Sequence, residues 1–353
     1  MAEKEIDKTI KSITGKLTAQ LKQSLTELKK VDTYLTEISR LNSKLSKTEL
    51  KQLGNDSFDI AGKYGKSAAD YLSNVKEMYS AGYKNAESMA ELSMAIQTAG
   101  NLTADLANRY IFAADKAYNL GGTVEQLTQI LNGSNRITNH NSISMTELAN
   151  GMMVVGSAAA DAGLSIQETI AVLGTMISAS KQSGAEAAEA FKTILSNIQQ
   201  ISDEKLSTPM EVLKELAAQY KAFGKGNLKS SDLFSSVGEG TDSKALEALL
   251  SNWSMYETML EQYSAGTGSM ALEAEKVADS WEGSLNRLSN TWSDTVGNFV
   301  NSDAVVGVVN SLNGVLEVVN RVTDAIGPLA SVGLGAGLFA GIKNVGINML
   351  VAY

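Results

Sequence analysis

The chain has 353 residues, of which 44% are hydrophobic and only 6% aromatic, so its core must be built mainly from aliphatic side chains and methionine. A formal net charge of −9 argues against wholesale binding to a nucleic-acid backbone, which needs clustered lysine and arginine. The absence of cysteine excludes disulfide bonds and thiolate metal sites. The charged start MAEKEIDKTIK lacks the apolar stretch of a secretion signal, so we expect none.

Strong helix formers dominate the composition, and only Pro209 and Pro328 interrupt long stretches in which helix can propagate. No segment shows the sustained alternation of β-branched and polar residues that is typical of strands. We therefore predict an all-α fold in three parts. These are a long N-terminal amphipathic helix, a multi-helix array and an apolar, glycine-rich C-terminal helical segment.

Residues 1–50 are predicted to form one amphipathic helix, because apolar residues recur almost always at steps of three or four. This is far longer than the about 11–12 residues of an average globular helix, which favours a coiled-coil arm that pairs with other copies. A surface helix packed on its own domain is the alternative. The residues expected to mediate self-association are Ile6, Ile10, Ile13, Leu17, Leu21, Leu25, Leu28 and Leu35.

Turn-forming residues follow this arm. The sequence Leu53-Gly54-Asn55-Asp56-Ser57, with two further glycines at 62 and 65, predicts a hinge or linker over residues 51–65.

Residues 66–265 are predicted to form the helical core. Five sequences match the capping box, in which a hydroxyl caps the helix start and an acidic or amide residue three positions later hydrogen-bonds back. They are Thr123-Val-Glu-Gln126, Ser144-Met-Thr-Glu147, Ser165-Ile-Gln-Glu168, Ser183-Gly-Ala-Glu186 and Thr208-Pro-Met-Glu211. Short helices of this kind cannot each bury a face alone, so we expect them to stack on one another.

Residues 266–353 are predicted to be an apolar helical region. The segment 325–342 carries no charge, and its length just reaches the lower limit of about 17 residues for a membrane span. Within it, Gly333, Gly337 and Gly341 recur at every fourth position, a spacing that suits close helix packing or membrane contact.

Several blocks, in this order, resemble the core region of phage tail tape-measure proteins. They are AADAGLSIQE at 159–168, SGAEAAEAFKTIL at 183–195, EKVADSWEGSLNRLSNTWSDTVGNF at 275–299 and the glycine-rich stretch 325–342. The resemblance extends over residues 80–345. Chains of that family are usually much longer, so we expect this one to be a fragment or the ruler of a short tail.

The resemblance implies a structural protein that templates the length of the tail tube during assembly and is released during DNA delivery. It implies a homo-oligomer, a trimer by family resemblance, that meets tail-tube proteins, baseplate or distal tail proteins and tail assembly chaperones. The protein would lie in the lumen of the virion tail, and in the host cytoplasm during assembly. No catalytic residue is implied.

Residues with catalytic or ligand chemistry are scarce. His140 is the only histidine, so a histidine metal site lacks a second ligand of its kind. The glycines from Gly333 to Gly337 match part of a dinucleotide-binding pattern but lack its third glycine and a preceding strand. We expect no catalytic, metal or cofactor-binding residues, no enzymatic activity and no sequence-specific nucleic-acid binding.

The sequence leaves two other functions open. The first is a membrane-inserting helical pore or channel, in which the uncharged segment 325–342 enters the bilayer. The second is a secreted helical effector, because Trp281-Glu282-Gly283 is similar to the W-x-G bend of small secreted helical hairpins.

Overall fold

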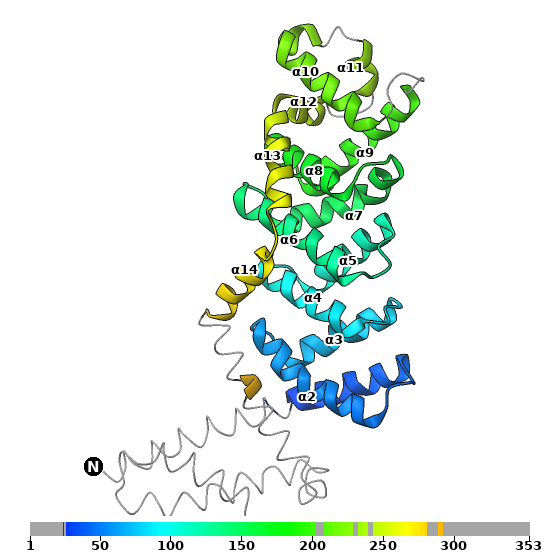
Figure 1. Ribbon diagram of the computed structural model, residues 1–353, viewed down its shortest axis with the longest axis vertical. Coiled ribbons are helices and arrows are strands. Elements are labelled where there is room, and N and C mark those ends of the chain that lie inside the picture. Colours follow the sequence, from blue (N-terminus) through cyan, green and yellow to red (C-terminus); the bar gives the residue numbers. More distant parts are fainter. Residues whose placement is uncertain are drawn as a thin grey trace, which may run out of the picture. The chain divides into compact units, whose positions relative to one another are not determined.

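The computed structural model describes residues 24, 26–201, 208–228, 232–238, 243–280 and 289–291 (Figure 1). Every regular element in these residues is a helix, so the predicted all-α fold is confirmed. The chain divides into two compact units. The first comprises residues 1–59, 67–69 and 285–353, and the second comprises residues 60–66 and 70–284.

An unlabelled helix over residues 26–41 precedes the labelled ones. These are α2 (Lys47–Lys63), α3 (Ala68–Ser80), α4 (Ala86–Ala99), α5 (Ala104–Tyr118), α6 (Val124–His140), α7 (Met145–Asp161), α8 (Ile166–Ser180), α9 (Gly184–Ile201), α10 (Pro209–Leu228), α11 (Asp232–Val237), α12 (Ser243–Ser251), α13 (Trp253–Ser264) and α14 (Ser269–Ala278).

The first loop between helices lies earlier in the chain than the sequence predicted. The helix 26–41 is followed by a loop over 42–46, where Ser46 N–H donates to Glu49 Oε2 at 2.7 Å and Glu49 N–H donates to Ser46 Oγ at 3.2 Å. The backbone hydrogen bond from Ser46 lowers the pKa of Glu49. This capping box starts α2, so one continuous helix over 1–50 is wrong.

The turn expected at Leu53–Ser57 is also wrong, because α2 runs through it. Gly54 is buried, and a Cβ built on it would lie 3.0 Å from Leu35 Cδ1. The glycine therefore serves close packing against the preceding helix, and the Ser57 hydroxyl is satisfied within the helix by donating to Gly54 O.

The second unit contains three layers of helices. We call α5, α7 and α9 the outer row, and α4, α6 and α8 the central row; each row consists of helices that contact in succession. The chain then returns along the central row as α12 on α8, α13 on α8 and α6, and α14 on α6 and α4 (Figure 1). We call residues 243–278, which form α12 to α14, the strap.

The central row is enclosed on both sides. Every residue from Thr169 to Ser178 in α8 is buried, and these residues are apolar or small on all helical faces. In α9 of the outer row, by contrast, exposed residues such as Glu189 and Lys192 alternate with the buried Phe191 and Ile194. A helix that is apolar all round must be covered all round, so α8 requires the strap as well as the outer row.

Three of the predicted capping boxes are complete. In the box before α8, Ser165 N–H donates to Glu168 Oε2 at 2.8 Å and Glu168 N–H donates to Ser165 Oγ at 3.2 Å. The same pair of hydrogen bonds joins Ser183 to Glu186 before α9, and Thr208 to Glu211 before α10. These capping boxes start the helices through hydrogen bonds between residues close in sequence, so the sequence predicted these helix starts correctly.

The other two predicted boxes are not formed as boxes. Ser144 Oγ accepts from Glu147 N–H at 3.1 Å, but the Glu147 carboxylate accepts instead from the backbone N–H of Gly184, at the start of α9. Thr123 makes no side-chain cap, and its hydroxyl donates to Leu120 O at 2.7 Å. In the first case, tertiary packing has redirected a locally matched side chain.

Candidate functional site

Helix α13 of the strap packs closely against α6 and α8 of the central row, and glycines permit this close approach. A Cβ built on Gly133 of α6 would lie 2.4 Å from Cδ2 of Tyr263, so the ring rests directly on the helix backbone. A Cβ on Gly174 of α8 would lie 2.9 Å from Met259 Sδ. These two glycines form depressions into which the two large side chains of α13 fit.

Buried asparagines of α6 hold the start of α14. Gly268, at the N-cap of α14, offers no side chain, and Asn132 Oδ1 accepts from Met270 N–H at 2.9 Å. One turn along, Asn135 Nδ2 donates to Ser269 Oγ at 2.8 Å. Asn132 therefore acts as a cap supplied by another helix, and it satisfies an N–H that the strap cannot satisfy itself.

Further polar contacts hold the end of α13. Asn141 Nδ2 donates to Gln262 Oε1 at 2.7 Å. Gln167 Nε2 donates to Ser264 Oγ at 3.0 Å and to Leu260 O at 3.4 Å. Together with the asparagines of α6, these contacts concentrate on residues 260–270, where α13 ends and α14 begins. Directional hydrogen bonds at this one joint fix the register of the strap on the central row.

Two tyrosines, one buried and one half-buried, join the layers through hydroxyl groups. Tyr110 of α5 shares a hydrogen bond of 2.6 Å with Ser134 Oγ of α6, and Tyr118 shares one of 2.7 Å with Thr169 Oγ1 of α8. Burial raises the pKa of Tyr118 to about 12, and it also raises the pKa of Tyr110. Both phenols are therefore neutral near pH 7, which suits hydrogen bonding between helices.

The closest approach between two helices of the outer row lies at the start of α9. A Cβ on Gly184 would lie 1.8 Å from the backbone oxygen of Glu147, and one on Gly151 would lie 2.9 Å from Gly184 O. The Glu147 carboxylate binds Gly184 N–H in the same contact. An anionic group at a helix N-terminus is favourable, so one residue both packs against α9 and caps it.

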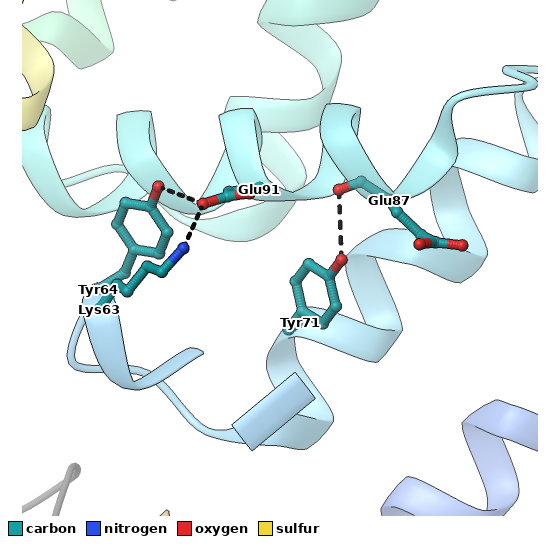
Figure 2. A network of polar contacts seen from close by, with 5 residues as sticks. All are labelled: Lys63, Tyr64, Tyr71, Glu87 and Glu91. Carbon is teal, nitrogen blue, oxygen red and sulfur yellow. Dashed lines mark hydrogen bonds and ion pairs between the residues drawn. The ribbon is translucent and has the colours of Figure 1, made fainter. Parts of the chain in front are cut away.

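Polar contacts also connect the first residues of the second unit to α4 (Figure 2). Lys63 Nζ lies 3.3 Å from Glu91 Oε1, to which Tyr64 OH donates at 3.1 Å. Tyr71 OH donates to Glu87 O at 3.4 Å. The lysine and glutamate side chains are 61% and 36% exposed, so the ion pair contributes little stability and the tyrosine contacts matter more.

Most of the residues singled out for assembly fall outside the described residues. Of the predicted self-association set, Leu28 and Leu35 are described, and both are half-buried. Leu35 contacts Gly54 within the same chain. The glycines Gly333, Gly337 and Gly341, and the whole segment 325–342, lie outside the described residues. Among the helices that the structure describes, none has the length and apolar character needed to cross a membrane.

His140 is exposed at the end of α6, and its Nδ1 lies 2.9 Å from Arg136 O. Within the described ranges, no three histidine or carboxylate side chains gather in a way that could hold a metal ion.

Sequence reasoning missed the residues that join the strap to the central row, namely Asn132, Gly133 and Asn135 of α6 and Tyr263 of the strap. One signal was present. An isolated glycine such as Gly133 inside a helical pattern costs stability unless close packing requires it. The local pattern does not indicate which residues pack there, however, because Tyr263 and Met270 are distant in sequence from Gly133 and Asn132.

Comparison with known families places the array in context. Residues 47–244 match the family described as "Phage-related minor tail protein". The match covers α2 to α11, and ends just as the strap begins. No solved structure matches the chain.

Proposed function

The chain belongs to the phage-related minor tail protein family, which makes it a structural component of a phage tail, and from this premise we propose that it is a tail tape-measure protein. In this role it templates the length of the tail tube during assembly and leaves the tail during DNA delivery. Its work is mechanical, and we propose no enzymatic activity for it.

The observation that carries the proposal is the serial build of the matched region. Helix pairs α4–α5, α6–α7 and α8–α9 follow one another, each helix contacting the next in its row. The extent of such an array grows with each added pair, because every repeat contacts only its neighbours. A protein whose dimension is proportional to its number of residues suits the role of a ruler.

The test removes one helix pair in frame. Deleting residues 124–165 takes out α6, α7 and the following cap, and it places Thr123 directly before Ile166. The resulting Thr-Ile-Gln-Glu sequence retains a capping box for α8. Tails are then measured by electron microscopy. A ruler used as extended helix predicts tails about 60 Å shorter, at 1.5 Å per residue. A ruler used as a stacked array predicts only about 10 Å, one interhelical spacing.

The matched control duplicates the same segment, which should lengthen tails by the amount that the deletion shortens them. Tails of unchanged length with both variants would refute the ruler. The runner-up roles predict other results. A pore-forming protein predicts release of dye from liposomes by the intact chain, and a secreted effector predicts its export.

The proposed partners follow from the same role. We propose that the N-terminal arm, through Ile6 to Leu28, joins copies into a homo-oligomer, while Leu35 packs on Gly54 of its own chain. We also propose that tail-tube proteins, distal tail proteins and assembly chaperones bind the chain. The proposed places are the tail lumen and, before that, the host cytoplasm. Substituting Ile10 and Leu17 with glutamate should dissociate the oligomer in sedimentation, whereas Lys11→Glu should not.

A further inference from the structure

We propose that the strap, residues 243–278, is a releasable latch. Its helices α13 and α14 detach from the central row as one unit, while the outer row and α12, which also packs on α9 and α10, keep their packing. This release allows the compact array to extend. The biological consequence rests on the proposed function, because a ruler of stacked helices must open before it can follow the tube as a long chain.

Helix α13 of the strap buries fewer residues than any helix of the central row, because Tyr256 and Met259 are its buried residues. Helices α13 and α14 are short, and neither Asn252 before α13 nor Gly268 before α14 provides a side-chain cap, a feature that they share with the longer helices α4 and α6. On α14, Leu272 is 62% exposed and Val277 is 42% exposed, so much of its apolar surface contributes nothing to docking. In α8, by contrast, ten consecutive residues from Thr169 are buried. Local opening starts where buried contacts are fewest.

The hydrogen bonds that hold the strap lie close together in the sequence, so we expect them to break together. The side chains of Asn132, Asn135, Asn141 and Gln167 form hydrogen bonds with residues 260–270, and the Thr175 hydroxyl donates to Met259 Sδ at 3.6 Å, one residue before this joint. When this joint leaves the surface, α13 loses its register and α14 loses the cap that Asn132 supplies. The two helices therefore dissociate cooperatively.

Release has a defined effect on the central row. The ring of Tyr263 leaves the backbone at Gly133, and Met259 leaves Gly174, Ile137 and Ile143, which cluster at the same place. The apolar face of α6 and α8 is then exposed to water. Since a helix that is apolar all round is unstable in that state, the opened array is driven toward a rearranged form.

The first measurement is hydrogen exchange on the purified full chain. Backbone amides of α13 and α14 should exchange with a common opening rate, about 10-fold or more faster than the amides of Thr169 to Ser178 in α8. Exchange of the strap no faster than that of α8 would overturn the proposal, because the strap would then open only when the whole unit unfolds.

The second measurement locks the latch with a reversible bond. In the double variant Gly133→Cys with Tyr263→Cys, a sulfur at position 263 takes nearly the place of Tyr263 Cγ, which lies 2.7 Å from a Cβ on residue 133. About 3 Å separates a Cβ from the far sulfur of a disulfide, so the bond can close. The natural chain has no cysteine, so no other pair competes.

Oxidation should slow strap exchange to the rate of α8, and reduction of the same sample should restore it. Equal exchange in both forms would overturn the latch. A further pair of variants does not depend on this design. Asn132→Ala should accelerate exchange of α13 and α14 together about 10-fold, whereas Asn139→Ala, an exposed change on the same helix, should leave it unchanged. These results do not depend on tail length, so the latch and the ruler can fail separately.

Discussion

The contact between α7 and α9 yields the sharpest prediction for stability. In Gly184→Ala, the new Cβ would lie 1.8 Å from the backbone oxygen of Glu147 and 2.6 Å from its carbonyl carbon. Because both are backbone atoms, no rotamer change relieves the clash, and the two helices must separate. Overpacking costs about 1–3 kcal/mol, and loss of the charged hydrogen bond from Gly184 N–H adds about 1.5–3 kcal/mol.

We therefore expect Gly184→Ala to lower the free energy of unfolding by about 3–5 kcal/mol, and the melting temperature by about 10 °C for a unit of this size. Urea unfolding of the full chain, followed by helical circular dichroism, measures it. Gly156→Ala is the matched control. Its Cβ would meet ordinary neighbours at 3.5 and 3.6 Å, so it should stabilise α7 by about 0.5–1 kcal/mol. Equal stabilities of the two variants would refute the packing argument.

Two smaller predictions concern a cap and a pH range. Ser165→Ala should cost about 1 kcal/mol in the same urea assay, and a loss no larger than that of the exposed Ser157→Ala would contradict the capping box. Alkaline pH should destabilise the fold, because Tyr118 has a pKa of about 12 when folded and about 10 when unfolded. The contribution of Tyr118 to the free energy of unfolding is complete below pH 10 and is lost as the pH rises to about 12. Circular dichroism at increasing pH should therefore show a smaller loss of helical signal in Tyr118→Phe than in the natural chain.

Local chemistry explains why much of the fold was predictable. Ser165 and Glu168 lie three residues apart, and the hydrogen bonds between them need no other part of the chain. The same holds for Pro209 at the first position of α10. Helix type and helix starts follow from such spacings, and so does the all-α class.

Packing between distant segments explains why the turn predicted at Gly54 and the capping box predicted at Glu147 are not formed. The Gly54 region has the composition of a turn, yet α2 continues through it because Leu35 packs onto the glycine. Glu147 has the spacing of a capping box, yet its carboxylate binds Gly184 N–H, where it also faces the positive end of α9. In both cases a tertiary contact outweighed a local preference that is worth about 1 kcal/mol.

In the strap, weak local signals and strong contacts with distant segments occur together. Its helices have no side-chain caps at Asn252 and Gly268, so local signals alone would rate α13 and α14 as weak. The missing cap is supplied by Asn132, and the missing burial by depressions at Gly133 and Gly174. A segment that folds only against a surface made by other helices loses its structure when it leaves that surface. The same features that hid the strap from sequence reasoning therefore make it the part of the array suited to open first.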